Sequence, residues 1–170
     1  KSNFISAMKV KFVDLQRQNK HLKKYLMPAI EKVILEADFS LGPRLEKFEK
    51  EFAKYVGKKY AIGLNSGTDA LLLSLMAYGI GQGDEVIVPP NSYFSTAMVV
   101  SNLGGKPVFV DINPDYYTID PAKIEAAITR KTKAIIPVHL FGQPADMKPI
   151  IAIAKKHKLV VIEDACPAHG

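Results

Sequence analysis

The sequence has a single cysteine and no long apolar segment. One cysteine, Cys166, excludes an internal disulfide and suits a reducing, cytoplasmic location. We expect Cys166 to be a small buried apolar residue and not a nucleophile. No apolar run reaches the roughly 18 residues that a membrane-spanning helix needs, so a membrane protein is not expected.

Two glycine-rich motifs are also absent. No G-x-G-x-x-G follows the first predicted strand, which disfavours a nicotinamide-dependent oxidoreductase, and there is no P-loop. The net charge of +6 could suggest nucleic-acid binding. The basic residues are scattered, however, over presumed helices that also carry apolar positions, and no nucleic-acid-binding motif accompanies them. We therefore expect neither nucleic acid nor a metal ion as a partner.

The first third of the chain predicts two amphipathic helices. Apolar residues recur at steps of three and four between Leu22 and Ile34, and again between Leu45 and Val56. Gly57 is placed to end the second helix. Residues 1–7 precede the first methionine and are expected to be a vector-derived remnant or an upstream extension, so residues 8–59 form the predicted N-terminal helical segment.

From residue 60 the pattern changes to short apolar runs separated by helical segments. These runs lack polar alternation, which is typical of strands buried on both faces of a parallel sheet. They lie at Tyr60–Leu64, Glu85–Val88, Pro107–Ile112, Ala134–Leu140 and Leu159–Ile162. Asp120-Pro121 predicts the start of one intervening helix through Ile128, and Asp146 to Lys158 predicts another. Residues 60–170 are thus expected to form a three-layer α/β/α domain with a mostly parallel sheet, and we expect it to be truncated after the last strand.

Ligands of open parallel sheets bind at the carboxyl ends of the strands. The first such end carries Ser66-Gly67-Thr68-Asp69, in which Ser66 and Asp69 form a capping-box pattern and the free N–H groups of the helix attract a phosphate. A capped helix without a ligand is equally consistent with this loop, and the Asp69 carboxylate would repel a phosphate. The anion site is a weak prediction from this loop alone.

Two further strand ends carry an aromatic pair, Tyr93-Phe94, and a carboxylate, Asp164. Aromatic residues that open a helix are usually core, and a carboxylate at a strand end is usually a cap or a surface charge. Taken with the anion site, however, they fit pyridoxal 5'-phosphate, which has a phosphate, a flat ring and a pyridine nitrogen that needs a counter-charge.

The chain resembles the DegT/DnrJ/StrS family of fold type I sugar-nucleotide aminotransferases. The resemblance runs from about Met8 to Gly170 in matching order and spacing. Its segments are Phe12-Val13-Asp14-Leu15, Leu41-Gly42-Pro43, Ser66 to Leu71, Gly83 to Pro89, Val138 to Met147, and Glu163-Asp164-Ala165.

The resemblance implies a role for each matching position. Gly67, Thr68 and the backbone of Asp69 would cradle the cofactor phosphate, and the Asp69 side chain would turn to its own cap. Tyr93 would stack on the pyridine ring, with Phe94 as the alternative. Asp164 would pair with the pyridine nitrogen and keep it protonated.

The sequence departs from the family at two points. Pro167 stands where relatives usually have a glutamine that contacts the phenolic oxygen of the cofactor. None of the lysines matches the motif of the Schiff-base lysine, so we expect the chain to be an N-terminal portion without it.

The resemblance implies a pyridoxal-phosphate-dependent aminotransferase that takes an amino group from an amino acid, glutamate, and gives it to a nucleotide-linked keto-sugar. It also implies a homodimer. Two alternatives stay open: a dehydratase of the same family, and a non-catalytic α/β module that binds a phosphorylated ligand or a partner chain.

Overall fold

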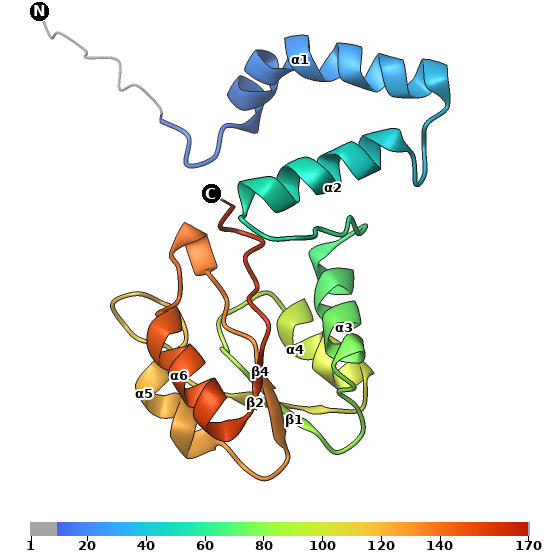
Figure 1. Ribbon diagram of the computed structural model, residues 1–170. Helices are drawn as coiled ribbons and strands as arrows, with labels where there is room; N and C mark the ends of the chain where they lie inside the picture. Colours follow the sequence, from blue (N-terminus) through green and yellow to red (C-terminus); the bar gives the residue numbers. More distant parts are fainter. Residues whose placement is uncertain (1–9, 170) are drawn as a thin grey trace, which may run out of the picture. The chain divides into compact units, whose positions relative to one another are not determined.

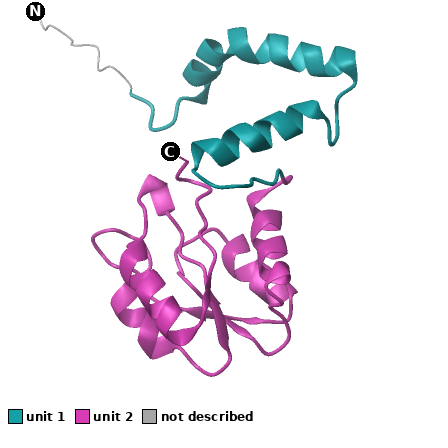
Figure 2. Ribbon diagram, in the orientation of Figure 1, with its two compact units in different colours: residues 1–63 teal, residues 64–170 magenta. Residues whose placement is uncertain are grey.

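The computed structural model describes residues 10–169, and the chain falls into two compact units that divide between Gly63 and Leu64 (Figure 2). The expectation for residues 1–7 lies outside the described residues. The domain assignment of residues 8–59 and 60–170 stays a prediction.

The first unit contains the two predicted helices. Helix α1 spans Leu15–Glu36, and the Asp14 carboxylate accepts a hydrogen bond from the Arg17 N–H at 3.1 Å, which caps its first turn. Helix α2 spans Pro43–Tyr55 and begins with proline, whose missing N–H costs nothing at that position. No residue of α1 is buried, so its apolar face is open to solvent within this unit.

The second unit is built on one parallel sheet of four strands in the order β2-β1-β3-β4. Its strands are β1 (Glu85–Val88), β2 (Lys106–Phe109), β3 (Thr132–Ile135) and β4 (Val160–Val161). All three pairings are parallel. The predicted mostly parallel sheet is confirmed, although the strands are shorter than the apolar runs.

Helices cover both faces of this sheet, so the second unit has three layers. Its helices are α3 (Gly67–Ala77), α4 (Ser95–Asn102), α5 (Pro121–Ile124) and α6 (Met147–His157), with 3₁₀ turns at Glu125–Ala127 and Leu140–Gly142. In Figure 1, α3 and α4 lie on one side of the strands, and α5 and α6 lie on the other. The predicted three-layer α/β/α class is confirmed.

The core of the second unit is split by the sheet into two clusters. Val86 and Val88 of β1 pack with Leu75 of α3 on one face. Ile87, between them in the sequence, packs with Ile150 of α6 on the other face. Because successive side chains of a strand point to opposite faces, a fully apolar strand must be covered on both sides.

The predicted strand at Tyr60–Leu64 is wrong. This segment lies outside all strands, and within residues 10–169 no strand pairs with it. The Gly63 N–H donates to the Glu49 carboxylate at 2.7 Å and not to a neighbouring strand, and Tyr60 and Ile62 are exposed. An apolar run becomes a strand only where a second strand supplies its hydrogen bonds.

The predicted helix after Asp120 is present but short. The Asp120 carboxylate accepts from the Ala122 N–H at 3.0 Å, as expected of an N-cap. The α-helix ends at Ile124, continues as a 3₁₀ turn to Ala127, and gives way to extended backbone at Ile128. Over residues 10–169, the structure has no helix with the length and apolar character needed to cross a bilayer.

Candidate functional site

A pocket of about 250 Å³ lies where β1, β3 and β4 end, and it is called the edge pocket below. It is lined by Gly67, Thr68, Leu71, Ser92, Tyr93, Ser95, Val138, Leu140, Asp164, Cys166 and Pro167. Four of the residues singled out in the sequence, Gly67, Thr68, Tyr93 and Asp164, therefore face one concavity. Asp69 is not among the lining residues.

The N-terminus of α3 forms one end of the edge pocket. The Ser66 hydroxyl accepts from the Asp69 N–H at 3.1 Å and donates to the Asp69 carboxylate at 3.0 Å. The Asp69 side chain is thereby held at the cap. Gly67 and Thr68 are the first two residues of the helix, and their N–H groups have no partner inside it. A capped helix thus leaves two N–H groups and the positive end of its dipole available to an anion.

The Asp164 carboxylate also lines the edge pocket. It is 8% exposed and follows β4. Its Oδ1 accepts from the Cys166 N–H at 3.2 Å, and its Oδ2 accepts from the Thr96 hydroxyl at 3.5 Å. Both of these contacts are donated to Asp164, which matches an ionised carboxylate.

The backbone of Asp164 is fixed by the strand beside it. Its N–H donates to the Pro137 carbonyl at 2.9 Å, and its carbonyl accepts from the His139 N–H at 3.0 Å. These contacts make a parallel bridge between Val138 and Asp164. The pairing of the sheet therefore extends to the edge pocket and fixes the position of the Asp164 backbone there.

Tyr93 and Phe94 are not core residues. Tyr93 is 80% exposed and Phe94 is 74% exposed, so the usual assignment of such aromatics to the core does not hold here. Tyr93 lines the edge pocket and Phe94 does not. The exposed Tyr93 ring is thus the one available for stacking on a flat ligand.

The expectation that Cys166 is buried is wrong. The residue is exposed, and it lines the edge pocket. Partial desolvation of the sulfur, and then the negative charge of Asp164, raise the pKa of the Cys166 thiol. A thiol with a raised pKa is a poor nucleophile at neutral pH, in agreement with the assignment of Cys166 as unreactive.

Three hydroxyl side chains at the site were missed by sequence reasoning. Ser92 and Ser95 line the edge pocket, and Thr96 lies behind Asp164 with 1% exposure. The Ser92 and Thr96 hydroxyls are 2.9 Å apart. The spacing of four residues between Ser92 and Thr96 was readable in the sequence. The contact between Thr96 and Asp164 was not, because these residues are 68 positions apart.

His139 lies near the carboxyl edge but not in the edge pocket. Its Nδ1 accepts from the Ala145 N–H at 3.1 Å, which leaves the proton on Nε2 to donate to Glu163 at 3.1 Å. With both ring nitrogens engaged and 7% exposure, His139 holds the loop after β3 against the segment after β4. Its role is structural.

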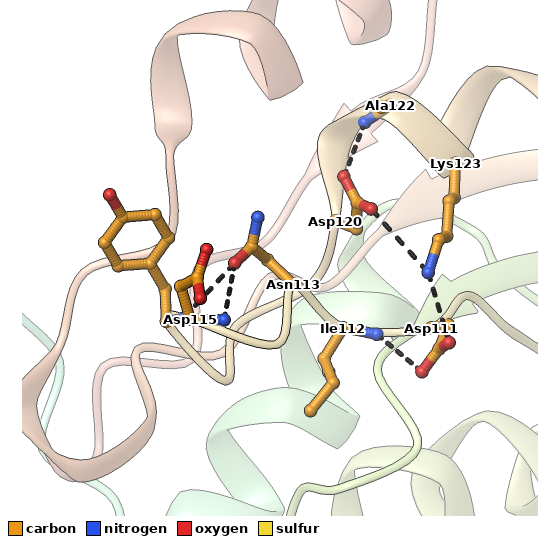
Figure 3. Close-up of polar contacts among 8 residues, drawn as sticks. Asp111, Ile112, Asn113, Asp115, Asp120, Ala122 and Lys123 are labelled. Atoms are coloured by element: carbon orange, nitrogen blue, oxygen red, sulfur yellow. Dashed lines mark hydrogen bonds and ion pairs between the residues drawn. The ribbon is translucent and has the colours of Figure 1, made fainter.

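Asp111, which closes the third apolar run, is separate from the edge pocket. Figure 3 shows its carboxylate between the Ile112 N–H at 2.8 Å and the Lys123 ammonium at 3.1 Å. The backbone hydrogen bond first, and then Lys123, lower the pKa of Asp111. This carboxylate stabilises the start of α5 and is not a pocket residue.

Among the described residues, the edge pocket fits pyridoxal 5'-phosphate in its donors and acceptors. The N-terminus of α3 offers N–H groups to a phosphate, the Tyr93 ring is free, and the buried Asp164 carboxylate faces the pocket. A Cβ built at Gly67 would lie 2.5 Å from the Cys166 sulfur, so only glycine leaves this end of the pocket open without displacing Cys166.

Comparison with known proteins gives one family. The model of the DegT/DnrJ/EryC1/StrS aminotransferase family matches residues 20–170. A "pleiotropic regulatory protein" of Geobacillus stearothermophilus is 50% identical over 163 residues, covering 96% of this chain and 44% of that protein. A UDP-2-acetamido-2-deoxy-3-oxo-D-glucuronate aminotransferase of Pseudomonas aeruginosa is 47% identical over 161 residues, covering 95% and 45%.

A solved structure is similar to this chain in both fold and sequence. The crystal structure of NtdA from Bacillus subtilis with bound cofactor PMP superposes with a TM-score of 0.89 at 46% identity. The match covers 95% of this chain and 38% of that one. The chain spans less than half the length of each of these relatives.

Proposed function

The chain belongs to the DegT/DnrJ/EryC1/StrS aminotransferase family, and from this premise we propose that it supplies part of a pyridoxal-phosphate site for sugar transamination. The proposed reaction moves an amino group from an amino acid, glutamate, to a nucleotide-linked keto-sugar. The observation that carries the proposal is the edge pocket, which brings a helix N-terminus, a free aromatic ring and a buried carboxylate together.

Each group that lines the edge pocket has its own task in this proposal. The N–H groups of Gly67 and Thr68, with the dipole of α3, bind the phosphate, and the Ser66 cap keeps Asp69 away from it. Tyr93 stacks on the ring face. Asp164 accepts a hydrogen bond from the ring nitrogen and holds the proton there. When bound, the cofactor draws electrons from the carbon that carries the amino group.

A covalent anchor for the cofactor is not among the residues that line the edge pocket, since none of these described residues is a lysine. We therefore expect this chain to bind the cofactor reversibly and without turnover by itself. Pro167 lines the pocket but has no side-chain donor, so the ring oxygen would need a partner other than the side chain of residue 167.

Two further properties belong to the same proposal. The apolar residues Leu26, Ile30 and Ile34 of α1 are exposed, which supports a homodimer as the state in which they are covered. The single cysteine supports a cytoplasmic location.

The proposal is tested with pyridoxamine 5'-phosphate, which has the same ring and phosphate and needs no lysine. Isothermal titration should show saturable binding, and Asp164→Asn should weaken it about tenfold or more because a charge-assisted hydrogen bond is lost. Glu163→Gln is the matched control, since Glu163 contacts His139 outside the edge pocket. Absence of binding to the unmodified chain would favour the non-catalytic module.

A second measurement addresses the lysine. The chain is mixed with pyridoxal 5'-phosphate, reduced with borohydride and digested, and labelled lysines are mapped. We expect scattered, substoichiometric labelling. Stoichiometric labelling of one lysine within Lys1–Gly170, with turnover of a keto-sugar nucleotide, would contradict the proposal that the anchor lies elsewhere.

A further inference from the structure

We propose that Thr96 is a positioning residue that fixes the Asp164 carboxylate relative to the backbone of Tyr93. The inference depends on the proposed function, because both concern the edge pocket. It assigns a part to Thr96, which does not line that pocket. Thr96 is 1% exposed and sits in the first turn of α4.

Two of the contacts of Thr96 connect it with proposed site residues. Its hydroxyl reaches Asp164 Oδ2 at 3.5 Å, and its N–H donates to the Tyr93 carbonyl at 3.0 Å. One residue thus connects the carboxylate proposed to meet the ring nitrogen with the segment that carries the proposed stacking ring. A displacement of Thr96 would change both at once.

The direction of the hydrogen bonds follows from proton counting. A threonine hydroxyl has one proton, and an ionised Asp164 can only accept. Thr96 therefore donates to Asp164, so the Ser92 hydroxyl, 2.9 Å away, must donate to Thr96. The result is a directed chain from Ser92 through Thr96 to Asp164 that ends on the carboxylate.

This series of hydrogen bonds explains why a threonine suits position 96. A valine has the same shape but would leave Asp164 Oδ2 and the Ser92 proton without a partner. Asp164 would keep its contacts with Cys166, from the N–H at Oδ1 and from the thiol, but would lose the hydroxyl that holds Oδ2. Thr96 acts through Asp164, since the edge pocket is lined by Ser92, Tyr93 and Asp164 but not by Thr96.

The test compares Thr96→Val with Thr96→Ser, which keeps the hydroxyl. Thr118→Val is the matched control, because Thr118 is 4% exposed and lies outside the edge pocket. Two readouts are used. The first is the NMR resonance of the Cys166 amide, whose proton is donated to Asp164, in the chain without ligand. The second is binding of pyridoxamine 5'-phosphate labelled with ¹⁵N at the ring nitrogen.

We expect Thr96→Val to shift the Cys166 amide resonance, to weaken binding about tenfold, and to move the ring ¹⁵N resonance toward that of a neutral pyridine. Thr96→Ser and Thr118→Val should stay within about twofold of the unmodified chain. A Thr96→Val chain that is folded, with an unchanged Cys166 amide resonance, would overturn the inference.

The two proposals can fail separately. If the unmodified chain does not bind the probe, the proposed function fails, while the amide resonance still decides whether Thr96 holds Asp164. A second outcome is that the probe binds, that Asp164→Asn weakens its binding, and that Thr96→Val does not. In that case the proposed function stands, and the part assigned to Thr96 is wrong.

Discussion

Asp69 and Ser66 bond to each other in both directions, with the Asp69 N–H donating to the Ser66 hydroxyl oxygen and the Ser66 hydroxyl donating to the Asp69 carboxylate. This reciprocal pair resolves the conflict between a carboxylate and an anion at the same helix end. The carboxylate is engaged at the cap, and the N–H groups before it stay available.

Ser66→Ala should lower the free energy of unfolding of the chain by about 1 kcal/mol, because the Asp69 N–H loses its cap. Chemical denaturation followed by circular dichroism measures the change. Ser74→Ala, inside the same helix, is the control and should change stability little. Equal losses for both variants would show that the cap adds nothing.

The second prediction concerns the short distance between Gly67 and Cys166. A Cβ at position 67 would lie 2.5 Å from the sulfur, so Gly67→Ala should destabilise the fold by about 1 kcal/mol, in spite of the better helix propensity of alanine. In a Cys166→Ala background the same change should be neutral or stabilising, since the clashing atom is gone.

The double-mutant cycle of Gly67→Ala and Cys166→Ala isolates this contact. Gly81→Ala serves as control, because its Cβ would meet nothing nearer than the Leu103 carbonyl oxygen at 3.8 Å. If Gly67→Ala costs the same with and without the Cys166 sulfur, the two residues are not coupled in this way.

Local signals in the sequence predicted most of the second unit. Ser66 and Asp69 predicted the cap of α3, and Asp120-Pro121 predicted the start of α5. These features depend on residues within four positions of each other, so they can be read from the chain. The parallel sheet followed from apolar strands that alternate with helices.

The errors arise where a residue depends on distant partners. The apolar run at Tyr60–Leu64 has the composition of a strand, but composition does not say whether another strand lies beside it. Cys166 has the size of a core residue, yet it faces the edge pocket. The contact between Thr96 and Asp164 gave no signal in the sequence, because the two residues are 68 positions apart.

Glu85 gives a prediction on pH. The Thr129 hydroxyl donates to the Glu85 carboxylate at 2.6 Å, and this contact first, then the Lys106 charge, lower the pKa of Glu85 in the folded chain. A depressed pKa stabilises the fold above the unfolded value of about 4.3. The stabilisation is lost as the pH falls through the folded value.

Thr129→Val should therefore raise the pKa of Glu85 and shift acid unfolding of the chain to higher pH. The difference in stability between the two chains should be largest at neutral pH, should begin to shrink below the unfolded value of about 4.3, and should disappear once the pH lies below the lowered pKa of Glu85 in the folded chain. Thr129→Ser, which keeps the hydroxyl, is the control. A difference that stays constant between pH 7 and pH 3 would contradict the assignment.

The thiol of Cys166 reports on Asp164 without any ligand. Partial burial and the Asp164 charge both raise the pKa of Cys166, and the second cause disappears in Asp164→Asn. The variant should have a lower thiol pKa, hence more thiolate at a given pH and faster alkylation by iodoacetamide near pH 8. The single cysteine of the chain makes the rate unambiguous.

Glu163→Gln is the control for this measurement. Glu163 is the neighbouring carboxylate, but it contacts His139 and is not among the causes that raise the pKa of Cys166. Its removal should leave the alkylation profile close to that of the unmodified chain. If Asp164→Asn and Glu163→Gln accelerate alkylation equally, the effect is one of net charge, and Asp164 does not face the sulfur as an ionised carboxylate.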